Sequence, residues 1–152
     1  MIMDSRAEFA AASTALNTGV AGSYLLGNVI DLSVVTANFD VGLGEQLYLI
    51  ILVNTAVTSA GAATVQFQLV SDTVAAISPT APAHVHAATG AIPKATLVAG
   101  YRAFVVALPL DSYSRYLGIV QVTGVAALTA GAVQAFIVLR PAKWLATYAG
   151  VH

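Results

Sequence analysis

The residue types best suited to metal chemistry in this sequence are two histidines separated by one residue. His84 and His86 would carry both imidazole rings on the same side of a strand, as a pair of metal ligands requires. The nearest carboxylate is Asp72, and no third histidine lies close to the pair. The sequence has no cysteine, so it offers neither a thiolate ligand nor a thiol nucleophile. We therefore expect no bound metal and no cofactor, and we assign the two histidines to a loop.

The acidic residues could support general acid–base chemistry, but their positions favour a structural role. Nearly all seven lie at the ends of predicted strands or in turns, where a carboxylate accepts hydrogen bonds from backbone amides. They are Asp4, Glu8, Asp31, Asp40, Glu45, Asp72 and Asp111. Their spacing alone leaves a paired-carboxylate glycosidase open. No serine lies in a G-x-S-x-G turn, and no glycine pattern indicates a phosphate-binding loop. The sequence predicts a protein that is not an enzyme and has no catalytic residues.

Runs of β-branched and aromatic residues predict a chain of short strands. Strands are expected at residues 28–32, 47–53, 64–70, 91–95, 101–108, 116–123 and 132–139. The apolar run 47–53 is continuous enough to be a strand buried on both faces. Turn residues 59–62 predict a hairpin between 47–53 and 64–70, and residues 124–131 predict a second hairpin between the last two strands. Residues 71–90 lack periodicity and are expected to form one long loop.

This succession of short strands, without an amphipathic helix, predicts an all-β fold: a single-domain, jelly-roll-like β-sandwich. A chain of 152 residues is long enough for one domain with a real core. We expect residues 28–140 to form the sandwich, with residues 1–27 as an N-terminal segment or arm and residues 141–152 as a C-terminal tail. The opening residues have two acids and no basic region before an apolar run, so we expect no secretory signal.

The low charge of the chain points to binding as its activity. Hydrophobic residues make up 58% of the sequence and charged residues 9%, against roughly 25% charged in an ordinary soluble domain. Over an expected surface of roughly 7,000 Å², so few charges leave wide neutral areas of the kind that mark binding surfaces. A net charge of −1 with six basic residues argues against nucleic acid as a partner. We expect no membrane span, because glutamines and a turn interrupt the uncharged stretch 46–71. A homodimer or a homotrimer is predicted.

Several short segments between residues 29 and 139 have an order and spacing that can be compared with a known family. The segments are residues 40–49 (DVGLGEQLYL), 58–66 (TSAGAATVQ), 90–93 (GAIP) with 97–102 (LVAGYR), 115–117 (RYL) and 128–133 (LTAGAV). Together they resemble the capsid cement proteins of tailed bacteriophages, which decorate and stabilise the phage head. No segment among them is a catalytic motif.

The resemblance implies a jelly-roll-like fold, a small homo-oligomer and a place on the outer capsid surface of a virion. The partner it implies is a major capsid protein of the HK97-like fold. It further implies a protein made in the host cytoplasm that joins neighbouring capsid subunits and stabilises the head against the pressure of packaged DNA. A carbohydrate- or receptor-binding β-sandwich exposed on a virion stays open as the alternative, and a hydrolase is a third hypothesis.

The residues expected to contact the capsid lie in the long loop and in the C-terminal tail. A loop of this length and a free chain end can reach across a subunit boundary where a tight hairpin cannot. Trp144 and Tyr148 are large aromatics that bury much area per ordered side chain, although they could equally cover the core of their own domain. The expected contact residues are Pro79, Pro82, His84, His86, Trp144 and Tyr148.

Overall fold

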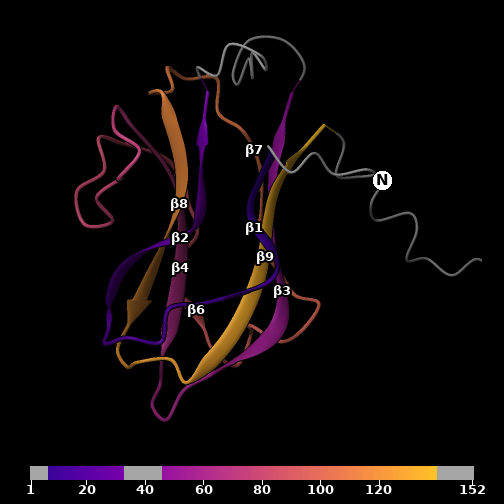
Figure 1. The fold of residues 1–152 in the computed structure, drawn as a ribbon. Helices are drawn as coiled ribbons and strands as arrows, with labels where there is room; N and C mark the ends of the chain where they lie inside the picture. The colour runs from indigo at the N-terminus through magenta and orange to yellow at the C-terminus, as the bar shows by residue number, and fades with distance from the viewer. Residues whose placement is uncertain (1–6, 33–45, 140–152) are drawn as a thin grey trace, which may run out of the picture.

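The computed structural model describes residues 7–32 and 46–139, which form two antiparallel sheets packed face to face (Figure 1). Sheet A has the strand order β1-β9-β3-β7, and sheet B has the order β2-β8-β4-β5, with β6 also paired to β4. Within the described residues, no helix has the length and hydropathy needed to cross a bilayer. The strands are β1 (Glu8–Ala15), β2 (Gly22–Asp31), β3 (Tyr48–Thr58), β4 (Thr64–Asp72), β5 (His84–Ala88), β6 (Ile92–Pro93), β7 (Arg102–Ala107), β8 (Tyr116–Gly124) and β9 (Ala130–Val138).

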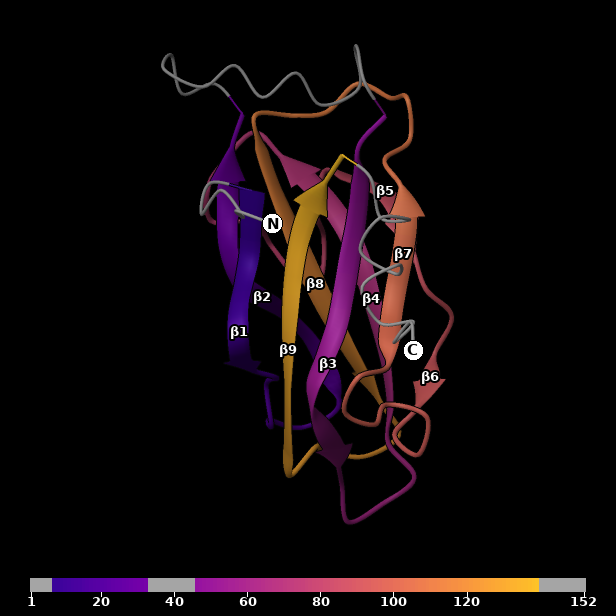
Figure 2. The same ribbon diagram turned by 90° about the vertical axis from the view of Figure 1, so that its right-hand side faces the viewer.

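The pairing of the strands is that of a jelly roll. The first strand pairs with the last, β2 pairs with β8, β3 pairs with β7, and β4 pairs with β5. Two further pairs, β3 with β9 and β4 with β8, join these into the two sheets that Figure 2 shows one behind the other. A long hairpin rolled up in this way is the double Greek key of a jelly roll. The prediction of an all-β, single-domain, jelly-roll-like β-sandwich is confirmed.

Alternating side chains bring one face of each sheet into the core. In β4, Val65, Phe67 and Leu69 point inward and are fully buried, whereas Gln66 and Gln68 between them are partly exposed. In β3, the exposed fraction does not exceed 2% at any of residues 49–51, so the predicted burial on both faces holds for the centre of the run, whereas Leu47, Tyr48 and Leu52 are partly exposed. Inward-facing residues of other strands that belong to the same core are Leu49, Ile51, Val53, Leu117, Ile119, Val133 and Ala135.

The sandwich begins earlier than predicted, because the N-terminal segment supplies two strands. β1 forms an edge of sheet A against β9, and β2 forms an edge of sheet B against β8. The two edge strands approach each other at Gly27, where φ is +66° and an added Cβ would lie 2.1 Å from the carbonyl oxygen of Phe9. Only glycine fits this contact. The assignment of residues 1–27 to an arm is therefore wrong from residue 7 onward, while the tail 141–152 lies outside the described residues.

Neither of the two predicted hairpins forms. β3 and β4 belong to opposite sheets, and so do β8 and β9, so each connection crosses the sandwich. The two crossing turns lie side by side. The Thr129 amide donates to the Thr58 carbonyl at 2.8 Å, and the two threonine hydroxyls are 2.7 Å apart. The Ser59 hydroxyl donates to the Ala127 carbonyl at 2.6 Å. The turn residues indicate where the chain reverses, but not the sheet to which it goes next.

The predicted long loop over residues 71–90 is also corrected. β4 continues to Asp72, and the His84 segment forms β5 at the edge of sheet B, so only residues 73–83 connect them. Ile77 anchors this connection on the outer face of sheet B, where it is 3% exposed and packs against two buried valines of β4 and β8. Burial of one apolar side chain therefore ties the connection to the sheet.

Candidate functional site

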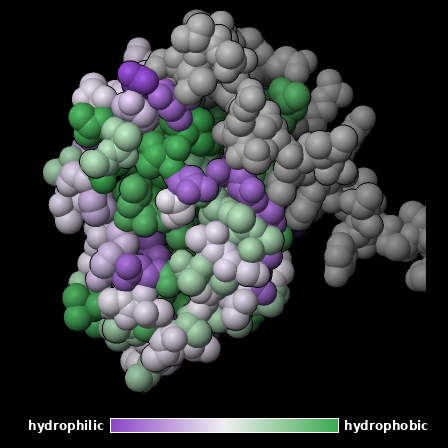
Figure 3. All heavy atoms as spheres, viewed as in Figure 1, coloured by the Kyte–Doolittle hydropathy of each residue, from purple (hydrophilic) through white to green (hydrophobic). Residues whose placement is uncertain are grey.

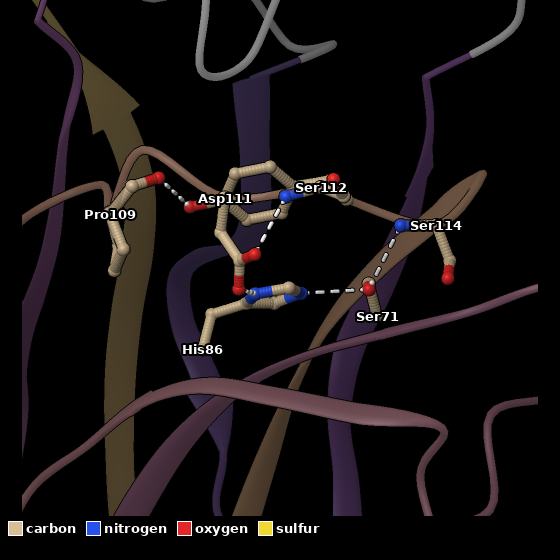
Figure 4. A network of polar contacts seen from close by, with 7 residues as sticks. Ser71, His86, Pro109, Asp111, Ser112 and Ser114 are labelled. Atoms are coloured by element: carbon tan, nitrogen blue, oxygen red, sulfur yellow. Dashed lines mark hydrogen bonds and ion pairs between the residues drawn. The ribbon is translucent and has the colours of Figure 1, made fainter.

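A network of polar contacts lies where the connection between β7 and β8 meets sheet B (Figure 4). Ser71 points inward near the end of β4, His86 lies on β5, and Asp111 and Tyr113 belong to the connection. Ser71 is fully buried, and the His86 side chain is 1% exposed, whereas the Asp111 side chain is 58% exposed. The network therefore runs from the core to the surface.

His86 bridges the two sides of this network. Its Nδ1 lies 3.0 Å from Asp111 Oδ2, and its Nε2 lies 2.8 Å from Ser71 Oγ. Ser71 Oγ also accepts the backbone N–H of Ser114 at 3.0 Å, which leaves the serine proton to donate to Nε2. In the neutral imidazole the proton then sits on Nδ1 and is donated to Asp111. Every polar atom in this chain of contacts has a partner.

The connection is held at two further points. Asp111 Oδ1 accepts the backbone N–H of Ser112 at 2.7 Å. This hydrogen bond, and after it the one from His86, keeps the pKa of the Asp111 carboxyl below its ordinary value of 3.8. The Tyr113 ring centroid lies 4.2 Å from that of His86, and its hydroxyl donates to the Pro109 carbonyl at 2.7 Å. Burial, and then the charge of Asp111, raises the pKa of Tyr113 to about 12.

The serine, histidine and aspartate contact one another in the order found in a hydrolase triad, but their accessibility is reversed. A triad nucleophile faces the substrate, and its carboxylate is buried behind the histidine. Here Ser71 is the fully buried member and its oxygen already accepts an amide, whereas Asp111 is the exposed member. The Ser71 hydroxyl cannot reach a substrate in this arrangement. The geometry instead fastens the β7–β8 connection to sheet B.

A protein-family model matches the sequence over the same strands. The Bbp16 family model matches residues 9–137, from β1 to β9. The chain belongs to the Bbp16 family. Bbp16 is a bacteriophage-related protein family. The matched range contains nearly all of the jelly roll together with the polar network, so both are parts of the Bbp16 region. No curated protein matches the chain.

Four of the six expected contact residues, Pro79, Pro82, His84 and His86, lie in the part of the chain that the structure describes. Pro79 and Pro82 are partly buried in the connection between β4 and β5, which Ile77 ties to sheet B. Trp144 and Tyr148 lie outside the described residues. The prediction that residues 71–90 form a long, freely extending loop is therefore wrong.

The two histidines have different roles. His84 is exposed on β5, whereas the His86 side chain is buried with both ring nitrogens engaged. The prediction of His86 as a surface contact is wrong, because its ring faces the core side of the sheet edge. The ring centroids lie 6.1 Å apart, and the described residues contain no group of three side chains that could hold a metal ion.

The other members of the network have little signal in the sequence. Asp111 is predicted to lie in a turn, which agrees with its contact with Ser112. The contacts of Ser71 and Tyr113 with His86 are not predicted from the sequence. Each residue is 15 or more positions from His86 along the chain, so only the folded sheets bring them together. The histidine pattern itself is the one signal that points to this place in the fold.

Proposed function

We propose that this protein is a structural virion protein that binds the outer surface of a phage capsid and cements neighbouring subunits of the major capsid protein. The observation that carries the proposal is a charge-poor jelly roll in a chain of a bacteriophage-related family. Its partner in this proposal is a shell of the HK97-like fold, and its place is the outside of the head. Each copy acts by binding, without turnover.

The surface of the jelly roll supports this proposal. The chain exposes 7954 Å² and has thirteen charged residues, so the average is about one charge per 600 Å². Large apolar side chains are also exposed, among them Leu110 at 80% and Val20 at 77%. Interface cores are depleted in charge, because a buried charge must give up its hydration. A surface with few charges therefore suits a protein that functions in stable contact with other proteins.

The alternative of a carbohydrate- or receptor-binding module has less support. Sugar sites are built from exposed aromatic rings with carboxylates and amides beside them. Among the large exposed hydrophobics of the described residues, Tyr101 is the one aromatic, and it is 36% exposed. The polar network offers no substitute, because its carboxylate already binds Ser112 and His86.

The cement function predicts association at two levels. A homodimer or homotrimer is expected from the wide neutral surface, and light scattering at micromolar concentration measures it. Many copies on one shell then add modest contacts through multivalency, which is how weak individual contacts resist internal pressure.

The direct test uses phage heads assembled from a genome that lacks the gene for this chain. The purified full-length protein should co-sediment with these heads and saturate at a fixed number of copies per shell. Heads that carry it should retain their DNA at a higher temperature than bare heads. Isolated capsid subunits serve as the control and should bind at least tenfold more weakly. Absence of binding to bare heads, with binding to host cells or glycans instead, would favour the receptor-binding alternative.

A further inference from the structure

The two ends of the sandwich differ in charge. One end, here called the charged end, is where β2 and β4 finish and β8 begins. Asp31 and Arg115 form a two-point ion pair there, with N–O distances of 3.0 and 2.8 Å. Seven charged residues lie in the described part of the chain. The five at the charged end are Glu8, Asp31, Asp72, Asp111 and Arg115.

The opposite end is nearly free of charge. It is formed by four connections, which Figure 2 shows together at the bottom of the molecule: residues 17–21, 59–63, 94–101 and 125–129. We call these residues the loop end. Lys94 is the one charged residue among them, and its ammonium group donates to the Ser59 carbonyl inside the same surface. The seventh charged residue, Arg102, begins β7 just beyond them. The lower part of Figure 3 accordingly has mainly pale and green atoms.

Hydrogen bonds hold the loop end together. The Ser59 hydroxyl bonds the Ala127 carbonyl, and the Lys94 amide donates to the Ala63 carbonyl at 3.0 Å. The ideal Cβ position of Gly61 lies 2.7 Å from Ala126 Cβ, so the two crossing turns are in direct contact. The loop end is therefore a preorganised surface, which loses little conformational entropy when it binds.

One residue of the loop end has a strained backbone. Val125 has a φ of +68°, and the Ala126 amide donates to the Gly124 carbonyl at 2.8 Å across it. This is a γ-turn of positive φ, a rare and strained conformation that disfavours a β-branched residue. The Val125 side chain is nevertheless 76% exposed and gains little from its own fold. A strained and exposed apolar side chain indicates a role outside the monomer.

The loop end carries a second exposed valine, Val20. β2 and β8 pair from Gly22 opposite Thr123. Val20 precedes Gly22 by two residues and Val125 follows Thr123 by two, so both valines lie just beyond the same end of this strand pair. Val20 is 77% exposed. The loop end thus carries two exposed apolar side chains on a neutral surface.

We propose that the loop end is the face that docks on the capsid shell, with Val125 and Val20 as its apolar anchors. The partner is an uncharged protein surface with an apolar depression. The loop end has a single charged group, the Lys94 ammonium, and this group already donates to the Ser59 carbonyl. The charged end then faces the solvent, where carboxylates stay hydrated. This inference rests on the proposed function, which supplies the shell.

The test uses variants that separate binding from folding. Val125→Gly and Val125→Asn place residues tolerant of positive φ in the strained turn, so Tm should be unchanged or raised by up to about 4 °C. Binding of the same proteins to heads lacking this chain should fall at least tenfold, and Val20→Asn should have a similar effect on binding. Val74→Asn and Leu110→Asn, at exposed apolar residues beyond the loop end, are the matched controls. They should bind like the wild type.

The outcomes distinguish this inference from the proposed function. If the wild type binds but the loop-end variants bind equally well, the docking face is wrong while the cement function stands. A tenfold loss confined to the two control variants would place the shell at the opposite end of the sandwich. If light scattering shows that the loop-end variants turn an oligomer into monomers, the face joins copies of this chain and the inference also fails. A wild type that does not bind heads overturns both.

Discussion

Substitution of Tyr113 by phenylalanine tests the polar network through its dependence on pH. The variant keeps the ring against His86 and removes only the hydroxyl that donates to the Pro109 carbonyl at 2.7 Å. A hydrogen bond of this kind contributes about 1 kcal/mol to the free energy of unfolding. We therefore expect Tyr113→Phe to be less stable than the wild type by about 1 kcal/mol at pH 8.

This difference should shrink in alkali. The pKa of Tyr113 is about 12 in the folded protein, against the ordinary tyrosine value of 10.0 that applies to the unfolded chain. The wild-type contribution is fully present below pH 10 and is lost as pH rises through 12, because the unfolded chain releases the phenolic proton first. A pKa shift of this size would change the free energy of unfolding by about 2.7 kcal/mol. Because the Tyr113 side chain is partly exposed and its charge is screened by solvent, we expect a change of about 1 kcal/mol. About half of that loss should occur by pH 11.

Urea unfolding of the two proteins at constant ionic strength, followed by far-ultraviolet circular dichroism, measures this convergence. The difference in unfolding free energy should be the same at pH 7 and pH 8, where the phenol is protonated in both states. It should then narrow by about 0.5 kcal/mol at pH 11. A difference that stays constant up to pH 11, or widens, would refute the placement of the Tyr113 hydroxyl in a partly buried position close to the Asp111 carboxylate.

Three further predictions concern the described fold. Gly27→Ala should destabilise the protein by about 2–4 kcal/mol in urea unfolding, because its φ is +66° and the new Cβ would meet the Phe9 carbonyl oxygen; a loss below about 1 kcal/mol would contradict that contact. Ile77→Ala should cost about 2 kcal/mol and make residues 73–83 the first site of limited proteolysis, whereas wild-type resistance would show that the anchor is unimportant. Zinc or a chelator should change Tm by less than about 1 °C, since His86 has both ring nitrogens engaged; a rise of several degrees with zinc would revive a metal site.

The strands are easier to predict from the sequence than their connections. β-branched and aromatic runs mark β3, β4, β7, β8 and β9 within a few residues, because such side chains fit a half-buried pleated surface wherever they occur. β1 is not predicted, since residues 10–12 are all alanine and give no alternation of hydrophobic and polar side chains. The predicted hairpins are wrong because a Ser-Ala-Gly-Ala turn reports only a reversal of direction. Which sheet receives the next strand depends on contacts made far along the chain.

The candidate site is predictable from the sequence only in part. An alternating pair such as His84 and His86 has the spacing of strand residues, and both do lie on β5, but the prolines and the missing periodicity around them favour a loop. Burial of His86 follows from the register of β5 on β4, which shifts between Leu69 and Val70 and brings its ring to Ser71. The carboxylate then arrives from a connection 25 residues later. Contacts of this kind form only once the sheets are assembled.

The pairing of the first strand with the last has a consequence for synthesis on the ribosome. β9 lies between β1 and β3, so sheet A has no continuous hydrogen bonding until the end of the domain has left the exit tunnel. Until then the apolar strand β3 lacks one of its neighbours, and such an exposed edge invites aggregation. Folding must also wait for contacts of very long sequence separation, which are slow to form. The polypeptide can therefore acquire its finished shape only after translation of the domain is complete, and a chain truncated before β9 should be a substrate for chaperones and proteases.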